Sequence, residues 1–375
     1  MNELSLYIHI PYCKRKCTYC NFHFSTNFST KYEFIQSLIK EIESRKNELV
    51  YQEVGTIYFG GGTPSVLEDQ ELANIINVIY KNYKISPSTE ITVEINPDDF
   101  SPDKAVFYKI IGINRLSIGI QSFFDDHLVW MNRSHNAIQS LQCLELLRKH
   151  SFNNVSCDLI FGIPGCTNDQ WIKNIDTLMN FGIPHLSCYA LTVEENTVLS
   201  HKILHRTTPP PEDNHTIEQM EILLDKIDEN AYEAYEISNY CKSGFRSKHN
   251  SNYWNYTPYL GFGPSAHSFD GSKRRWNISN NNLYVKKINN NEEYYESETL
   301  SDKEKANEFV MLQLRKTEGI NILDLQKIQG SENYKIAPIL SQYLSSGHLV
   351  KENNNIKLSR SGKYISDRII ADLFI

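Results

Sequence analysis

Two hydrophobic periodicities alternate over about the first 200 residues of the chain. Short stretches in which apolar residues recur at every second position are separated by longer stretches with the period of about 3.6 residues that marks a helix. The regular succession of these two patterns predicts parallel strands connected by helices. The six segments with the strand pattern are Leu4–Ile10, Thr56–Phe59, Glu90–Ile95, Arg115–Ile120, Asn154–Ile160 and His185–Leu191.

Most of these segments have one apolar face and one polar face. In the first, Leu6 and Ile8 alternate with Tyr7 and His9, and the third to fifth repeat the pattern with Glu94, Ser117 and Asp158 among their polar positions. A flat parallel sheet covered by helices on both sides should be apolar on both faces. A polar face instead favours strands that curl around a polar interior, with the helices outside. The sequence therefore predicts an α/β fold, a partial (β/α)6 TIM-like barrel, rather than a Rossmann-like sheet.

Three expected helices carry capping signals at their first residues. A serine or threonine before an apolar run can cap a helix, more so with Glu or Gln three residues later, and proline suits the first helical position. The signals are Ser65 with Glu68, Ser101 before Pro102 with Gly112 beyond the helix end, and Thr167 with Gln170.

The alternation ends after about residue 206. "TTPPPEDN" (207–214) marks the exit from the barrel, a helix is expected over Glu212–Asn230, and 231–300 is predicted to be strands and loops that cover the barrel. Beyond it, three helices, a hairpin in "HLVKENNNIKLS" and a last helix over Gly362–Leu373 predict an α+β region like a winged helix, without a basic recognition face. We expect three domains, over 1–210, 211–300 and 301–375.

Composition limits where the protein is expected to be found and which partners it is expected to bind. The net charge of -7 is mild and the basic residues are scattered, so we expect no nucleic-acid partner. No secretory signal precedes the first strand, and no stretch approaches the roughly 18 apolar residues of a membrane span. Eight cysteines in such a chain are expected to be reduced, which favours a cytoplasmic location.

Three of the eight cysteines, Cys13, Cys17 and Cys20, follow the first strand with the spacing C-x3-C-x2-C. One tight loop of this spacing can aim three sulfurs at a single point. A cubane iron–sulfur cluster normally takes four cysteines, so three would leave one iron open for chemistry. Lys14, Arg15 and Lys16 between the ligands would offset the charge of the thiolates.

Two other interpretations of these cysteines stay open. His23 lies three residues after Cys20, so the loop also fits a Cys3His zinc site, and unliganded core cysteines are the third possibility. The remaining five cysteines have no ligand spacing and are expected to be small buried groups. These are Cys143, Cys157, Cys166, Cys188 and Cys241.

A second group of candidate residues falls at the ends of successive strands. "FGGGTPS" (59–65) follows the second strand and either lets a ligand approach the backbone or forms a plain turn. Each polar residue in the group could be structural when taken alone. Together they fall at the carboxyl ends of strands, where barrel enzymes place their sites. They are Glu94, Gln121 and Asp158, with Arg133 in a following loop or helix.

The segment "SKHNSNYWNYTPYLGFGPSAHSF" (247–269) combines histidine, asparagine, aromatic residues and glycines. One interpretation is a packed strap in which Tyr253 and Trp254 fill a core and His249 is hydrogen-bonded. The other is a platform for a flat ligand, with aromatic faces for stacking and a neutral imidazole as an axial ligand of iron.

The order of these motifs resembles that of a known family. C-x3-C-x2-C, GGGTP, "VEINP", "NRLSIGIQSF" and "DLIFGIPG" follow one another as in radical S-adenosylmethionine (SAM) proteins, over essentially the whole chain. The resemblance is closest to the oxygen-independent coproporphyrinogen III oxidase (HemN)-like group, and within it to the heme-chaperone subgroup, HemW. "YIHIPYC", "LSCYALTVEENT", "YEISNY" and "HNSNYW" carry the resemblance to that subgroup.

The resemblance implies cofactors and the residues that hold them. Cys13, Cys17 and Cys20 would hold a [4Fe–4S] cluster whose fourth iron is chelated by the amino and carboxylate groups of SAM. An electron donor for the cluster is then also expected. By matching motifs, the residues that line the SAM pocket would be Tyr7, Gly61, Gly62, Thr63, Glu94, Gln121, Arg133 and Asp158.

Two departures separate the chain from the decarboxylating dehydrogenase of this group. That enzyme continues its motif with a fourth cysteine, where this sequence has Asn21-Phe22, and it has an N-terminal extension ahead of the position of Met1. Both favour a heme chaperone that binds heme and delivers it to an acceptor protein, free or membrane-associated, with His249 in contact with the heme. The alternative functions are radical oxidative decarboxylation of coproporphyrinogen III and a zinc-stabilised binding module. No catalytic residue is assigned, and enzyme activity stays open.

Overall fold

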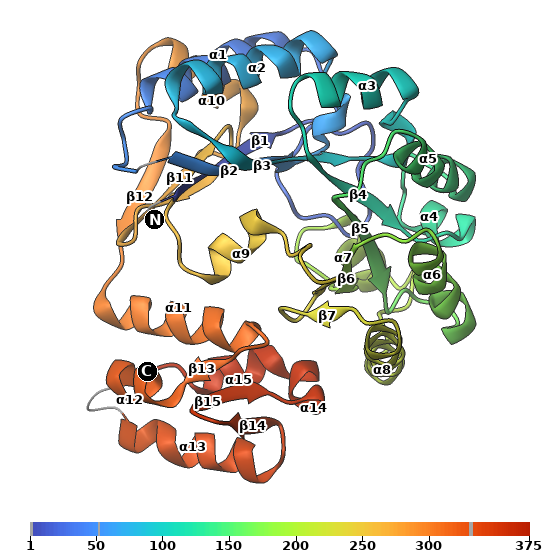
Figure 1. Cartoon of the computed structure of the whole chain (residues 1–375), viewed down its shortest axis with the longest axis vertical. Helices are drawn as coiled ribbons and strands as arrows, with labels where there is room; N and C mark the ends of the chain where they lie inside the picture. Colours follow the sequence, from blue (N-terminus) through green and yellow to red (C-terminus); the bar gives the residue numbers. More distant parts are fainter. Residues whose placement is uncertain (1–2, 52, 330–332) are drawn as a thin grey trace.

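A single large sheet organises the chain. The structure is a computed structural model that describes residues 3–51, 53–329 and 333–375, so Met1 lies outside the described residues. The sheet has twelve strands in the order β12-β11-β10-β9-β1-β2-β3-β4-β5-β6-β8-β7 (Figure 1). Within the described residues, no helix is both long enough and apolar enough to cross a membrane.

The six central strands confirm the predicted parallel α/β fold, a partial barrel. Each pairs in parallel with the next strand along the chain. The second and third begin earlier than predicted, because Pro87 and the serines around it hide the start of the third from a hydrophobic pattern. The strands are β1 Glu3–Ile10, β2 Glu53–Gly61, β3 Ile85–Ile95, β4 Arg115–Gln121, β5 Val155–Phe161 and β6 His185–Ala190.

The helices between these strands cover one face of the sheet. Leu6, Ile8 and Ile10 are fully buried there in the main hydrophobic core, while Tyr7 and His9 lie on the opposite, inner face. The predicted division into an apolar outer and a polar inner face is therefore present in β1. The helices are α1 Lys31–Ser44, α2 Asp69–Asn82, α3 Pro102–Ile110, α4 Asp125–Trp130, α5 Ala137–Lys149, α6 Asn168–Asn180, α7 Val198–Leu204 and α8 Asp213–Glu229.

Two of the three predicted capping signals are confirmed and one is wrong. The side chains of Ser101 and Thr167 accept hydrogen bonds from the first turns of α3 and α6. Ser65 does not cap α2, because Pro64 starts a short 3-10 turn in which the Ser65 hydroxyl donates to Asp99 at 2.7 Å. The cap residue of α2 is Glu68, the residue before Asp69.

The segment 231–300 extends both edges of the sheet and also places a helix on its inner face. Asn252 of α9 donates to the Ser5 hydroxyl of β1 at 2.9 Å, and His249 is hydrogen-bonded to Thr56 of β2, so α9 packs against the polar face. The predicted domain bounds stay a prediction. The elements are β7 Glu233–Ala234, β8 Asn239–Cys241, α9 Lys248–Trp254, β9 Tyr259–Phe262, β10 His267–Phe269, β11 Lys273–Asn277, α10 Asn281–Asn289 and β12 Tyr295–Thr299.

The C-terminal elements group at one end of the molecule, beyond α9 (Figure 1). They have a hydrophobic core of their own and a small antiparallel sheet in the order β13-β15-β14, as expected of a winged-helix-like region. The last helix predicted over Gly362–Leu373 is two helices that meet at Ile365. The elements are α11 Asp302–Arg315, β13 Ile320–Asn321, α12 Ile322–Gln329, α13 Asn333–Ser345, β14 Leu349–Glu352, β15 Asn355–Leu358, α14 Arg360–Tyr364 and α15 Ser366–Asp372.

A buried ion pair joins α1 to the edge strands. Arg45 donates to Glu41 at 2.9 Å and to the carbonyl oxygen of Gly261 in β9 at 2.6 Å. The other carboxylate oxygen of Glu41 accepts from the backbone N–H of Gly263 at 2.8 Å and from the hydroxyl of Tyr284 at 2.6 Å. Arg45 also pairs with Glu48 at 2.6 Å, so its charge has two carboxylate partners, whereas the buried donors around Glu41 depend on that one carboxylate.

Replacement of Glu41 tests this connection. We expect Glu41→Ala to lower the free energy of unfolding by about 3–5 kcal/mol, since Tyr284 and the backbone N–H of Gly263 lose their buried acceptor and Arg45 loses one of its two carboxylates. Denaturant unfolding measures the change. Glu43→Ala is the matched control, because Glu43 lies exposed on the same helix. Equal losses in the two variants would contradict a special role for the buried pair.

Candidate functional site

The cysteine loop and the glycine turn run side by side at the carboxyl ends of β1 and β2. The backbone N–H of Gly62 donates to the carbonyl oxygen of Ile10 at 2.9 Å, and that of Thr63 donates to Tyr12 at 2.8 Å. A Cβ atom on Gly62 would lie 2.7 Å from these same two carbonyl oxygens, so no larger residue fits. Gly61 has φ +103°, which also favours glycine. Gly61 and Gly62 are therefore required by the backbone of the turn itself, and the turn lies directly beside the cysteine loop.

The three cysteines of the loop are half-buried, and two of them receive hydrogen bonds from outside it. The hydroxyl of Thr63 donates to Cys13 Sγ at 3.4 Å, and Arg133 Nη1 donates to Cys17 Sγ at 3.3 Å. Burial raises the pKa of Cys13 to about 12, partly opposed by the bond from Thr63, and the nearby Cys20 and Cys17 raise it further. Any metal that binds must therefore displace protons from these thiols.

The basic residues between the cysteines mainly fix the loop. Lys14 pairs with Asp98 at 2.9 Å and also with Asp99, so its charge is taken up outside the cysteines. Arg15 donates to the carbonyl oxygen of Arg133 at 3.3 Å. The expected charge compensation at the sulfurs comes in part from Lys16, which opposes the rise that burial causes in the pKa of Cys20, and in part from Arg133, which is distant in sequence.

The geometry does not favour the zinc interpretation. The Nε2 atom of His23 lies 2.7 Å from Asn281 Oδ1 in α10, so its ring is already engaged by another residue. Within the described ranges, no three side chains of His, Cys, Asp or Glu are arranged to hold a metal ion. The other five cysteines are free and buried, as predicted.

Two half-buried carboxyl groups lie on the inner face. Glu94 accepts a hydrogen bond from the hydroxyl of Tyr58 at 2.7 Å, yet burial raises its pKa to about 7, and the charge of Asp158 raises it further. Burial also raises the pKa of Asp158 to about 6, opposed by a hydrogen bond with Ser187 and by the charges of Arg115 and Arg133. Neither carboxylate forms a direct ion pair with a described residue. Two neighbouring acids of this kind can bind a cation.

Arg133 connects the cysteine loop to the strand ends. Its Nη2 atom donates to Asn96 Oδ1 at 2.7 Å and to the carbonyl oxygen of Gly119 at 2.9 Å, while Nη1 reaches Tyr19 as well as Cys17. Gln121, at the end of β4, has φ +65° and is buried. The candidate residues from the cysteine loop, β3, β4 and β5 thus come together, although their roles toward SAM stay a prediction.

His249 is fully hydrogen-bonded in this structure. Its Nδ1 lies 2.8 Å from the hydroxyl of Thr56, its Nε2 lies 3.0 Å from the hydroxyl of Tyr253, and its ring is stacked against Tyr58. The residue is 1% exposed, and burial lowers its pKa to about 3, so the imidazole is neutral. This arrangement agrees with the packed-strap interpretation, and contact with heme would require α9 to move.

Several residues of the site escaped the sequence analysis. Tyr58 donates a hydrogen bond to Glu94. It lies two residues after Thr56 in β2, so the alternation along the strand could have placed both side chains on the inner face. Tyr19 and Asn96 both bind Arg133, but no spacing connects either with an arginine so far along the chain. Such long-range polar pairs appear only in the folded chain.

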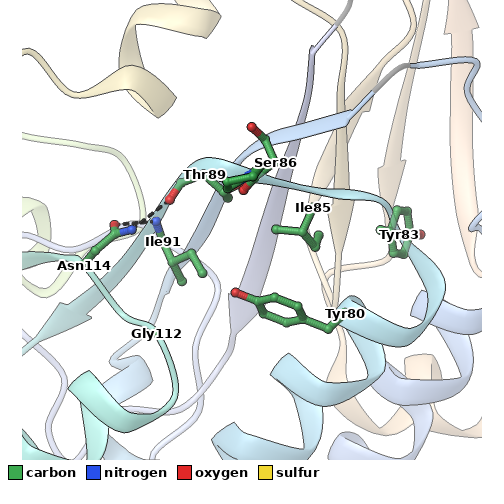
Figure 2. Close-up of a pocket in the computed structure, with 9 residues that line it drawn as sticks. Tyr80, Tyr83, Ile85, Ser86, Thr89, Ile91, Gly112 and Asn114 are labelled. Carbon is green, nitrogen blue, oxygen red and sulfur yellow. Dashed lines mark hydrogen bonds between the residues drawn. The ribbon is translucent and has the colours of Figure 1, made fainter.

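A surface cavity of about 430 Å³ lies elsewhere, near the start of β3 (Figure 2). Its lining includes Tyr80, Ser86 and Asn114. The side chain of Asn114 is already hydrogen-bonded to the backbone of β3. It accepts from the N–H of Ile91 at 2.9 Å and donates to the carbonyl oxygen of Thr89 at 2.8 Å. This cavity is at the amino-terminal end of the sheet, away from the cysteine loop, and we do not assign the chemistry to it.

Comparisons with known proteins agree with this geometry. Residues 7–178 match the model of the radical SAM superfamily, and residues 300–365 match that of the HemN C-terminal domain. The chain is 31% identical to a heme chaperone HemW of Bacillus subtilis, with 97% of each chain covered. It is 32% identical to a HemW of Lactococcus lactis, covering 84% of this chain and 82% of the relative.

Among solved structures, the chain is similar to the coproporphyrinogen III oxidase HemN of Escherichia coli. The TM-score is 0.86 at 18% sequence identity, and the match covers 100% of this chain and 90% of that one. At this identity the likeness concerns the fold. It confirms the partial barrel followed by a C-terminal α+β region.

Replacement of Glu94 tests the unpaired carboxylate. Since the pKa of Glu94 is raised in the folded chain, its contribution to stability is present below pH 4.5 and is lost as the pH rises to about 7. At about 1.4 kcal/mol per pK unit, this loss amounts to about 3 kcal/mol. We therefore expect Glu94→Gln to raise the melting temperature at pH values above 7 and to leave it close to that of the unmodified chain at pH 4.5.

Thermal unfolding at both pH values measures this effect, with Glu43→Gln as the control at an exposed position. A lower melting temperature of Glu94→Gln at the higher pH would mean that the folded chain already supplies a cation to this carboxylate.

Proposed function

Because the chain belongs to the HemW family of the radical SAM superfamily, we propose that it is a heme chaperone that holds a [4Fe–4S] cluster with exchangeable SAM and transfers heme to an acceptor protein. The superfamily implies the cluster and SAM, and the printed names of the relatives, "Heme chaperone HemW", support heme. Besides heme, the partners of this function are the acceptor protein and an electron donor for the cluster.

The cysteine loop is the proposed place of the cluster. Cys13, Cys17 and Cys20 would supply the three thiolates, and Thr63 and Arg133 already donate hydrogen bonds to two of them. Such bonds stabilise negative charge on sulfur. When bound, the cluster supplies one electron for cleavage of the carbon–sulfur bond of SAM.

The inner face beside the loop is the proposed place of SAM. The molecule carries two positive groups, an ammonium and a sulfonium, and the half-buried carboxylates of Glu94 and Asp158 form no direct ion pair with a described residue. The glycine turn lies beside the same carboxylates, since a Cβ atom on Gly60 would lie 3.0 Å from Oε1 of Glu94. The observation that carries the proposal is the meeting of three cysteines, a glycine turn and two unpaired carboxylates at one end of the strands. Tyr7, Gln121 and Arg133 complete the proposed pocket.

A second candidate function is radical oxidative decarboxylation of coproporphyrinogen III. The fold similarity to HemN favours it, because the whole chain follows the architecture of that enzyme. Fold alone does not decide function. The residues after Cys20 are Asn21 and Phe22, without a further cysteine, which favours the chaperone.

One experiment separates the two candidates. The anaerobic protein with a reconstituted cluster is incubated with SAM, a reductant and coproporphyrinogen III, and a parallel sample is titrated with heme under absorbance. We expect stoichiometric heme binding and no vinyl product. Formation of the vinyl product would assign the chain to the dehydrogenase, and absence of both would reject both functions.

The cluster assignment predicts a specific loss on replacement of one ligand. Cys17→Ser should abolish the iron and sulfide content of the reconstituted protein, because two thiolates and a weak hydroxyl ligand do not hold a cubane. Iron and sulfide analysis measures the loss. Cys143→Ser is the matched control, since Cys143 is a buried cysteine on α5 outside the loop. Retention of the cluster in Cys17→Ser would place its ligands elsewhere.

His249 remains the proposed heme contact within α9. Because both of its ring nitrogens are hydrogen-bonded, the role can be tested by replacing a hydrogen-bond partner as well as the histidine itself. His249→Gln keeps a polar side chain but removes the imidazole, so we expect weaker heme binding with the cluster intact. Tyr253→Phe removes the partner of Nε2 and frees the ring, so heme affinity should rise several-fold. A heme titration of both variants measures this. Unchanged affinity in both would reject contact between His249 and heme.

A further inference from the structure

A heme chaperone needs an imidazole that iron can reach, and most histidines near the cysteine loop are engaged. The Nε2–H of His9 donates to the carbonyl oxygen of His23 at 2.9 Å, and Tyr7 bonds to Nδ1 of His9 at 3.2 Å. His23 is held by Asn281, and His249 by Thr56 and Tyr253. His267 in β10 differs, because it is exposed and its ring has no hydrogen-bond partner within the described part of the chain.

The backbone around His267 is tightly constrained. A turn after β9 brings the N–H of Ala266 to the carbonyl oxygen of Gly263 at 3.2 Å, and Ser265 in this turn has φ +63°, a strained value for a non-glycine residue. A Cβ atom on Gly261 would lie 2.0 Å from the carbonyl oxygen of His267. This close approach fixes the main chain of His267 against the edge of β9.

The ring of His267 is also oriented by a neighbour. His267 and Trp276 are directly paired across the antiparallel strands β10 and β11. Their rings are stacked, with centroids 6.2 Å apart and planes inclined by 27°. Partial burial, together with the charge of Arg274, lowers the pKa of His267, which favours the neutral imidazole. A neutral imidazole held in one plane is a suitable axial ligand for heme iron.

His267 lies close to the cysteine loop. The turn between β9 and β10 lies against β1, since β9 pairs in parallel with β1 and a Cβ atom on Gly263 would lie 2.5 Å from the carbonyl oxygen of His9. His9 in turn is bonded to the backbone of His23, just after the last cysteine of the loop. The imidazole is therefore at the same end of the strands as the proposed cluster.

We propose that His267 is an axial ligand of heme bound at the exposed surface beside the cysteine loop, and that Trp276 positions its ring. The inference rests on the proposed heme-chaperone function and adds an accessible ligand to it. In the conformation described here, iron can reach His267 without any hydrogen bond being broken, whereas His249 must first leave Thr56 and Tyr253.

The experiment compares heme binding by the full chain with its reconstituted cluster and by four variants. We expect His267→Ala to lower heme affinity at least about tenfold and to lose the imidazole-type absorbance of the ferric complex, while added imidazole restores that absorbance. Cluster absorbance should be unchanged, which excludes misfolding. His205→Ala is the matched control, because His205 is also exposed but stacks only on His201 of α7.

Trp276 is tested as a positioning residue. Trp276→Ala should weaken heme binding several-fold while the imidazole-type absorbance remains, and Trp276→Phe should restore most of the affinity, since a phenyl ring can still stack on the imidazole. Loss of the absorbance itself in Trp276→Ala would overturn the positioning role.

The outcomes also separate this inference from the proposed function. If the unmodified chain binds heme and His267→Ala keeps both affinity and absorbance, the assignment of His267 is overturned and the chaperone function stands. If His205→Ala loses as much affinity as His267→Ala, binding is to surface histidines in general and the inference is overturned. If the unmodified chain binds no heme, both fail.

Discussion

Buried polar groups on the inner face of the sheet need partners, and this requirement shapes the whole site. Most are satisfied within the chain, as Arg133 is by Asn96 and His249 is by Thr56. Glu94 and Asp158 are among the exceptions, since burial raises the pKa of both and neither forms a direct ion pair with a described residue. Ionising these two neighbouring acids costs stability unless a cation binds, which supports the proposed ligand.

The same face explains how distant segments are held together. Arg133 lies more than a hundred residues after the cysteine loop, yet it contacts Cys17 and the end of β4. On the other side, Glu41 and Arg45 fix the edge strands that carry His267. Arg133 is half-buried and Arg45 is buried, and each donates to several acceptors, which ties its loop to the sheet. The positions of the cysteines and of the exposed imidazole thus depend on the barrel rather than on their own short segments.

The sequence was sufficient for the parts of the fold that follow local periodicity. The six central strands and the gathering of Glu94, Gln121 and Asp158 follow from alternation and from the rule that parallel strands end at one edge. The strands β7–β12 are short and irregular, so they show no clear period and their places at the sheet edges depend on tertiary pairing. The cap of α2 was misassigned because Pro64 starts a separate turn. The state of His249 depends on Thr56 and Tyr253, and no sequence rule pairs those residues.

The position of an imidazole matters for a protein that must release its ligand. An enzyme gains from enclosing its substrate, because exclusion of water strengthens every electrostatic contact in the site. A chaperone must instead let an acceptor approach the bound group, and an exposed axial ligand permits exchange at iron without prior opening of the fold. The chain shares its architecture with HemN at a TM-score of 0.86, so architecture does not separate these two tasks. In this chain the accessibility of His267 and the hydrogen-bonded state of His249 agree with the proposed transfer of heme.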